Sequence, residues 1–248
     1  MTGTPPRAVF FDLYGTLIDI RTDEDDPWVY ATLAEYLGYW RVSITPPELA
    51  REYRSRVRAH LERSPERFPE VDVSIVFREI MTQYRRGGPD SGRDGADTTE
   101  IIAVSMLFRS LTRRFFATFP DIHQVLERLR AKYRIGLISD AQWVFTEPEL
   151  EIADLARYFP VRVLSSQIGV KKPSPRPFVQ AMRELGVAPE ASVYVGDNPP
   201  RDLAGARGAG MRCVIFRGEN VRHNGLVPDA CFHAYAELEG IVEALIGV

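Results

Sequence analysis

Cysteine is scarce in this sequence: Cys213 and Cys231 are the only two among 248 residues. A chain of this length with so few thiols is not a disulfide-rich secreted fold, and we expect both to be reduced residues of the core. Long apolar runs are also missing, since none approaches the roughly 20 residues that span a bilayer. The first seven residues lack the basic-then-apolar pattern of a signal peptide. These absences predict a cytoplasmic protein without a membrane partner.

Neither sign of charge is in large excess, because 31 basic and 34 acidic residues leave a formal net charge of −3. That balance gives no electrostatic footprint for nucleic acid, so no nucleic-acid partner is expected. The four histidines show no metal-ligand spacing, and there is no internal repeat or coiled-coil heptad pattern. A hydrophobic content of 45% is that of an ordinary globular protein that can bury a full core. The sequence is silent on oligomeric state.

The clearest positive signal is a short apolar run, Ala8–Phe11, which ends abruptly in Asp12 and is followed by Gly15 and Thr16. The run predicts a buried strand. Open α/β sheets bind ligands at the carboxyl ends of their strands, which is where this aspartate would lie. We therefore take Asp12 as a candidate nucleophile rather than as a turn residue or helix cap.

The next hundred residues are predicted to be helical. A polar, turn-prone stretch at 23–27 is typical of an exit from the first strand's domain. Apolar residues then recur at helical spacing in four segments, the last of them at 101–116. A breaker-rich stretch, Gly87–Asp97, is expected to be a mobile loop. The spaced residues of the first three segments are Val29, Leu33 and Leu37; Leu49, Tyr53, Val57 and Leu61; and Val73, Phe77, Ile80, Met81 and Tyr84.

From Pro120 onward, predicted strands and helices alternate. The strands are expected at 133–139, 161–165, 192–196 and 212–216, and the helices among them include 175–185 and 236–246. Such alternation predicts a parallel sheet covered on both faces. We expect an α/β fold with a Rossmann-like core of residues 7–20 and 120–248, interrupted by a helical cap domain of residues 21–119.

Four segments of the predicted core carry polar residues in a recognisable order. They are the run ending in Asp12; 135–140, ending in Ser139 and Asp140; 169–175, with Lys172 before a proline; and 193–202, with Asp197 and Asp202. In order and spacing, these segments resemble the four motifs of the haloacid dehalogenase (HAD) superfamily. The resemblance covers the whole predicted core and leaves only the cap unexplained. It implies a hydrolase in which Asp12 attacks the substrate and is covalently modified.

Phosphoryl transfer needs dense positive charge, because a carboxylate nucleophile and a phosphate dianion repel each other. The resemblance implies how that charge is supplied, by a magnesium ion and by a lysine. The implied roles are Asp12, Asp197 and the backbone carbonyl of Tyr14 as magnesium ligands; Asp202 at the metal, as a ligand or as the support of one; Lys172 as charge-neutralising cation; Ser139 as a hydrogen-bond donor to the phosphoryl group; and Gly15, Thr16 and Asp140 as substrate-binding residues.

Tyr14 departs from the phosphatase version of the first motif, which carries a second aspartate at that position. In the family's phosphatases this aspartate is the general acid and base, a contribution of about 10²–10⁴ in rate, and a tyrosine of ordinary pKa is a poor base at neutral pH. The family's 2-haloacid dehalogenases carry tyrosine there and work without metal, but they lack the Gly-Asp pair seen at Gly196-Asp197. An acidic pair beside Asp12 would repel a haloacid carboxylate.

We therefore predict a magnesium-dependent HAD-type phosphatase that acts on a small, anionic phosphorylated metabolite through an aspartyl phosphate on Asp12. Tyr14 is retained among the candidate catalytic residues. Two alternatives stay open: a dehalogenase-like hydrolase that forms an Asp12 ester without metal, and a low-turnover binding or regulatory protein with the same fold.

The predicted cap holds two further groups of interest. Its arginine-rich segment is expected to be a solvated helix face, or else to supply, with Arg41, a residue that holds the anionic substrate. The arginines of that segment are Arg51, Arg54, Arg56, Arg58 and Arg63. The aromatic residues expected in the cap core are Trp28, Tyr39 and Trp40.

Overall fold

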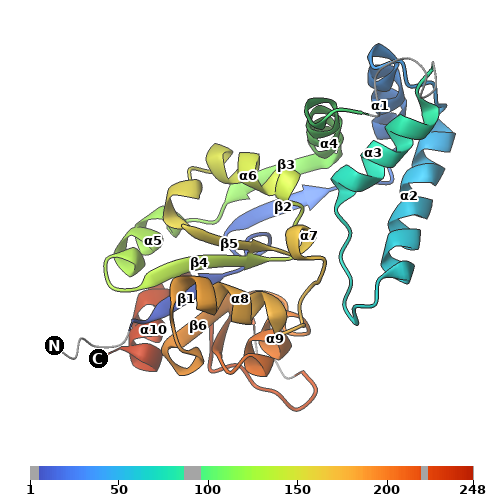
Figure 1. Ribbon diagram of the computed structural model, residues 1–248. Coiled ribbons are helices and arrows are strands. Elements are labelled where there is room, and N and C mark those ends of the chain that lie inside the picture. The colour runs from blue at the N-terminus through green and yellow to red at the C-terminus, as the bar shows by residue number, and fades with distance from the viewer. Residues whose placement is uncertain (1–5, 87–95, 219–222, 248) are drawn as a thin grey trace.

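The computed structural model describes residues 6–86, 96–218 and 223–247 (Figure 1). The predicted mobile loop Gly87–Asp97 therefore lies outside the described residues, except for its last two. Asp97 caps the helix that follows, because its carboxylate accepts a hydrogen bond from the backbone N–H of Glu100 and the Glu100 carboxylate accepts one in return. None of the helices in the described ranges combines the length and the apolar character needed to cross a membrane.

Six strands form one parallel sheet: β1 (Ala8–Phe11), β4 (Arg134–Ser139), β5 (Val161–Leu164), β6 (Ser192–Gly196), β7 (Arg212–Phe216) and β8 (Ala230–Phe232). Their order is β5-β4-β1-β6-β7-β8, so β1 is central and pairs with β4 on one side and with β6 on the other. The predicted α/β fold is confirmed. Strand β8 was not predicted, since three residues are too few for a periodic signal.

Helices cover both faces of this sheet (Figure 1). They are α5 (Ile122–Arg130), α6 (Trp143–Ile152), α7 (Ser165–Ile168), α8 (Arg176–Leu185), α9 (Asp202–Gly208) and α10 (Leu238–Ile246), with short 3₁₀ turns at Ala156–Tyr158, Pro189–Ala191 and Tyr235–Glu237. Successive side chains of a strand point to opposite faces. Val9 and Phe11 accordingly pack in an apolar cluster with α5 and α10, and Ala8 and Phe10 pack in a second cluster with α8 and α9.

Four further helices form a layer with its own apolar cluster: α1 (Pro27–Tyr39), α2 (Pro46–Arg63), α3 (Val73–Tyr84) and α4 (Thr98–Thr112). The rings of Tyr53, Phe77 and Phe108 pack against one another at the centre of this cluster, with centroids 4.9–5.4 Å apart. Val144 and Phe145 of α6 belong to the same cluster. The helical layer is therefore packed against the sheet-covering helix α6.

The segment 113–116, predicted as the end of the fourth helix, is not helical. Helix α4 ends at Thr112, and β3 (Arg113–Thr118) pairs antiparallel with β2 (Ile18–Thr22). The guanidinium of Arg21 lies 4.5 Å from the centre of the Phe115 ring across this pair. Pairing with a distant strand overrides the local helical pattern here. The β2–β3 pair connects the sheet to the helical layer, because the chain leaves along β2 and returns along β3. The predicted domain boundaries at 20/21 and 119/120 stay predictions.

The prediction of buried aromatic residues is wrong for two of three. Trp28 is 55% exposed and Tyr39 is 85% exposed, because the buried face of α1 is formed by Val29, Tyr30, Leu33 and Leu37. Trp40 is partly buried and packs against the apolar cluster of the helical layer. Both cysteines are free thiols, as predicted: Cys213 is buried and Cys231 is partly buried.

Candidate active site

Asp12 stands at the end of the central strand, between the ends of its two neighbours. Its backbone N–H donates to the carbonyl of Val195 in β6 at 2.9 Å, which continues the parallel ladder one residue beyond β1. Strand β6 ends one residue before Asp197, and β4 ends at Ser139. The parallel register therefore collects these side chains at one edge of the sheet.

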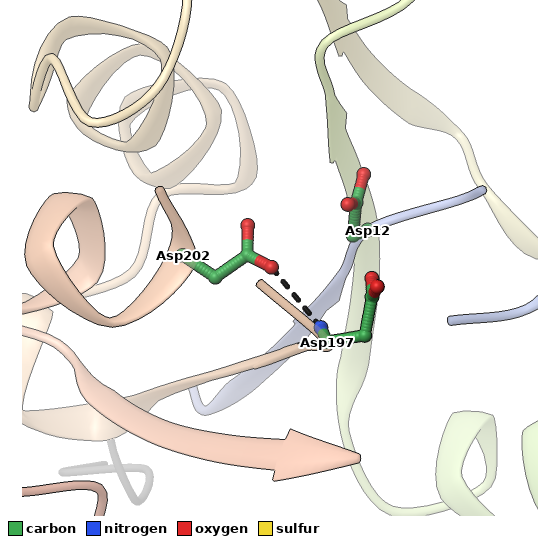
Figure 2. A group of neighbouring side chains, drawn as sticks. All are labelled: Asp12, Asp197 and Asp202. Carbon is green, nitrogen blue, oxygen red and sulfur yellow. Dashed lines mark hydrogen bonds between the residues drawn. The ribbon is translucent and has the colours of Figure 1, made fainter. Parts of the chain in front are cut away.

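Asp12, Asp197 and Asp202 form an acidic cluster, in which one carboxylate oxygen of each lies within 4.8 Å of the others (Figure 2). The hydroxyl of Thr16 donates to Asp197 at 2.9 Å. Gly15 has a φ of +87°, and a Cβ atom there would lie 2.5 Å from the Asp197 carboxylate. The turn after β1 thus needs glycine for its conformation and to let the Asp197 carboxylate approach.

Two members of this cluster, Asp12 and Asp197, have perturbed acidities. Burial raises the pKa of Asp12 to about 6, with Lys172 opposing the rise and Asp202 adding to it. Burial, followed by repulsion from Asp12 and Asp202, raises the pKa of Asp197 to about 6. Both carboxylate charges are therefore unfavourable in the folded protein, and a bound cation would stabilise them.

We expect the melting temperature of the metal-free protein to fall as pH rises. The folded-state pKa values of Asp12 and Asp197 lie above the unfolded value of about 3.9, so the stabilising neutral forms are lost as pH passes through 6. Calorimetry in chelator should show a fall of roughly 5 °C from pH 5 to pH 7.5. Magnesium should restore more stability at pH 7.5 than at pH 5. An unchanged pH slope in the Asp12→Asn/Asp197→Asn double variant would contradict this account.

Lys172 is the buried cation of the site. Its ammonium lies 3.0 Å from Asp12 Oδ2 and 2.7 Å from Asp202 Oδ1, and it donates to the Tyr194 hydroxyl at 2.9 Å. Burial opposes its charge, but the carboxylates of Asp12, Asp202 and Asp140 outweigh that effect and raise its pKa above the ordinary value. The side chain is thus a fixed positive charge beside Asp12.

Asp202 uses both of its carboxylate oxygens within the protein. Oδ1 accepts from Lys172 at 2.7 Å, and Oδ2 accepts from the backbone N–H groups of Asp197 at 3.0 Å and Asn198 at 2.8 Å. Asp202 therefore holds the lysine and the loop that carries Asp197. These contacts favour a supporting role for Asp202 over direct metal ligation.

Ser139 and Asp140 complete the edge of the sheet on the β4 side. Ser139 is buried, and its hydroxyl near the Asp12 carboxyl lowers the pKa of that group. Asp140 accepts from the backbone N–H of Lys172 at 2.9 Å and faces Arg201 at 3.7 Å. Its contact fixes the loop that presents the lysine.

The side chain of Tyr14 is directed away from this group and bonds to helix α6. Its hydroxyl donates to Glu149 Oε2 at 2.5 Å and lies 3.4 Å from the Thr146 hydroxyl. Glu149 accepts two further hydrogen bonds, at 2.9 and 3.0 Å, from Arg109 of α4 and lies 3.4 Å from Arg113. Burial and the Glu149 charge raise the pKa of Tyr14 well above its ordinary value. The phenol therefore stays protonated and cannot act as a base.

Sequence reasoning missed Glu149, Arg109 and Arg113. Glu149 gave one usable signal, since it is a charge on an otherwise apolar helical stretch, and a buried charge needs partners. Arg109 gave none. Three arginines of the predicted segment pair instead with acidic residues of the helical layer and of the segment leading into α1: Arg51 with Glu48, Arg54 with Asp25, and Arg56 with Glu52 and Glu79. Those pairs fit the solvated-face interpretation.

The fold and the site together define an α/β enzyme whose buried carboxylate and lysine meet at the carboxyl edge of a parallel sheet. Comparison with known proteins narrows this class. A family model described as haloacid dehalogenase-like hydrolase matches residues 6–210, and the chain belongs to that family. The predicted family and the predicted hydrolase class are confirmed.

The similar proteins include both phosphatases and dehalogenases, the two enzyme classes that the sequence left open. Glyceraldehyde 3-phosphate phosphatase of Methanopyrus kandleri is 30% identical over 206 residues, which cover 77% of this chain and 88% of the relative. Phosphoglycolate phosphatase of Escherichia coli is 27% identical over 217 residues, which cover 84% and 80%. Among solved structures, a 2-haloacid dehalogenase of Pseudomonas syringae aligns with a TM-score of 0.65 and 25% identity, covering 96% of this chain and 99% of that one.

Proposed function

We propose that this hydrolase is a magnesium-dependent phosphatase of small phosphorylated metabolites, with Asp12 as nucleophile. The observation that carries the proposal is the acidic pair of Asp12 and Asp197, each with a pKa raised to about 6. A haloacid would bring a further carboxylate to this pair, whereas a divalent cation would balance it and attract a phosphate. The phosphatase names of relatives that share most of the chain's length support the same choice. The cytoplasmic location predicted from the sequence remains part of this proposal.

The donor set fits magnesium, which prefers oxygen ligands. The carboxylates of Asp12 and Asp197 would supply two, and the backbone carbonyl of Tyr14 a third. Among the described residues, no hydrogen bond ends on that carbonyl oxygen. When bound, the ion would neutralise negative charge on the phosphoryl oxygens.

The other steps of the reaction are carried out by side chains of the protein. The Asp12 carboxylate attacks phosphorus, the bond from phosphorus to the leaving oxygen breaks, and water then attacks the phosphorus of the aspartyl phosphate to release inorganic phosphate. Lys172 holds a positive charge against the transferring group throughout, and the Ser139 hydroxyl hydrogen-bonds it. Thr16 and Asp140 contribute by fixing Asp197 and the Lys172 backbone.

A dehalogenase is the second candidate, and Tyr14 favours it. Tyrosine at this position suits a halide leaving group, which needs no proton, and the aligned 2-haloacid dehalogenase shares 25% of its residues with this chain. In that reaction the Asp12 carboxylate would displace halide from carbon and form an ester. A low-turnover binding protein would show neither activity.

The fate of solvent oxygen tests the proposal. Water attacks an aspartyl phosphate at phosphorus but attacks a dehalogenase ester at the Asp12 carbonyl carbon. We expect a single turnover in ¹⁸O-water, with enzyme in excess and magnesium present, to label the released phosphate and leave the Asp12 peptide unlabelled by mass spectrometry. Label in that peptide after reaction with a 2-haloacid, together with no release of phosphate from a panel of phosphate esters, would overturn it.

The environment of Tyr14 predicts a preference among phosphate esters. Because its hydroxyl is committed to Glu149, it cannot protonate a leaving oxygen. We expect acyl and nitrophenyl phosphates, whose leaving groups depart as anions, to react about 10²-fold or more faster in kcat/KM than alkyl phosphates, matching the usual worth of general acid catalysis. Equal rates on sugar phosphates and acyl phosphates would show that another group supplies the proton.

A further inference from the structure

The residue that follows the nucleophile by two positions is held by a charged network from two other parts of the chain. The network consists of Tyr14, Glu149 and Arg109, with Arg113 at its edge. Tyr14 belongs to the nucleophile loop (residues 13–17), Glu149 to the sheet-covering helix α6, and Arg109 to α4, the last helix before the chain returns along β3. These three side chains link the helical layer to residue 14.

Burial makes the charges of this network depend on each other. The Glu149 side chain is only 3% exposed and that of Arg109 is 14% exposed, so neither charge is compensated by water. Arg109 meets the carboxylate through two parallel hydrogen bonds, which fixes the orientation of both groups. A buried carboxylate that lost this partner would be strongly destabilised, because it would keep its desolvation cost.

Arg109 also contacts the Tyr14 ring directly. Its guanidinium lies 5.2 Å from the centre of the Tyr14 ring and 5.3 Å from that of Phe145, within the range of cation–π attraction. The Tyr14 ring is therefore held by its face and by its hydroxyl at once. A shift of α4 relative to α6 would strain or break both contacts.

We propose that the Tyr14–Glu149–Arg109 network couples the placement of α4 to the nucleophile loop, which makes Arg109 and Glu149 positioning residues of the site. Where the family's phosphatases carry an acid–base aspartate, this chain carries a tyrosine whose position depends on the placement of α4 against α6. The effect on metal binding rests on the proposed function, in which the Tyr14 carbonyl is a metal ligand. The effect on the loop itself does not.

Hydrogen exchange of the nucleophile loop tests the coupling without substrate or metal. The amides of residues 15–18 bond within the loop, to the carbonyls of Leu13 and Ile18. Glu149→Gln removes the charge but keeps an acceptor for the phenol. We expect it to accelerate exchange of these amides at least about 10-fold by mass spectrometry. Tyr14→Phe, which removes only the hydroxyl, should act in the same direction and serves if Glu149→Gln does not fold.

Glu100→Gln is the matched control. It removes the carboxylate of another buried arginine–glutamate pair on α4, formed with Arg85, that does not touch the loop. Glu100 lies in the first turn of α4, so we expect faster exchange at the end of α3 and the start of α4, with the Arg109 end of α4 and residues 15–18 unchanged. Wild-type exchange of the loop in Glu149→Gln, or equal acceleration by Glu100→Gln, would overturn the proposal.

Direct titration calorimetry with magnesium, without substrate, is the second readout. Glu149→Gln and Tyr14→Phe should bind the ion about 10-fold more weakly than wild type, and Glu100→Gln should bind it equally well. If wild type binds no magnesium, the proposed function fails while the exchange experiment still decides the coupling. Unchanged magnesium affinity in variants with a loosened loop would refute the metal-binding consequence.

Discussion

Replacing Asp12 by asparagine is expected to abolish turnover and, in the absence of metal, to stabilise the fold. Asparagine keeps the size of the side chain but is not a nucleophile, so kcat should fall on the order of 10⁴-fold or more. Because burial raises the pKa of Asp12 to about 6, its charge opposes folding at neutral pH. Lys172 keeps Asp202 as a partner at 2.7 Å. Steady-state kinetics and the melting temperature at pH 7.5 in chelator measure the two effects.

Asp197→Asn separates the nucleophile from the metal site. This variant loses a proposed metal ligand but keeps Asp12, so we expect a rise in the magnesium concentration for half-maximal rate of about 10-fold or more, with measurable turnover at saturation. Its Oδ1 can still accept from Thr16 at the present 2.9 Å distance. Activity above about 1% of wild type in Asp12→Asn would refute the assignment of the nucleophile. Full activity of the wild-type enzyme in excess chelator would refute the metal requirement.

The part of the site that sequence reasoning could find is the part that strand ends supply. Asp12, Ser139 and Asp197 each follow a buried run, and parallel strands align their carboxyl ends, so three segments far apart in the chain had to meet at one edge. Lys172 follows no strand directly, and only its motif identified it. The placement of Asp12, Ser139 and Asp197 at one edge follows from local pattern and from the backbone hydrogen bonds that dictate the register, whereas their roles came from the resemblance to the family.

The remainder depended on contacts between side chains of different helices. Glu149 and Arg109 meet because α4 packs on α6, and nothing in either helix specifies that partner. Strand β3 could not be predicted either, because it is stabilised by pairing with β2, from which α1–α4 separate it in the chain. The same contacts decide what Tyr14 does. The sequence showed only that Tyr14 replaces the general-acid aspartate of the family's phosphatases. In the structure its hydroxyl donates a hydrogen bond to Glu149.

Lys172→Met is expected to damage stability and activity together. The lysine side chain is 2% exposed and is the cation shared by Asp12 at 3.0 Å and Asp202 at 2.7 Å. Removing it leaves buried carboxylates uncompensated, which typically costs about 3–5 kcal/mol, or roughly 10 °C in melting temperature for a chain of this size. Loss of its charge beside the transferring group should lower kcat about 10³-fold. Calorimetry and saturating-magnesium kinetics provide the measurements.

The double variant Lys172→Met/Asp202→Asn separates the two roles of the lysine. Neutralising Asp202 removes the carboxylate that bonds most closely to the ammonium, and its amide oxygen can still accept from the backbone N–H groups of Asp197 and Asn198. We expect most of the lost melting temperature to return while kcat stays low, because the positive charge that Lys172 holds beside Asp12 is still missing. Recovery of activity along with stability would mean that Lys172 serves the fold alone, and that the positive charge required for phosphoryl transfer comes entirely from the metal.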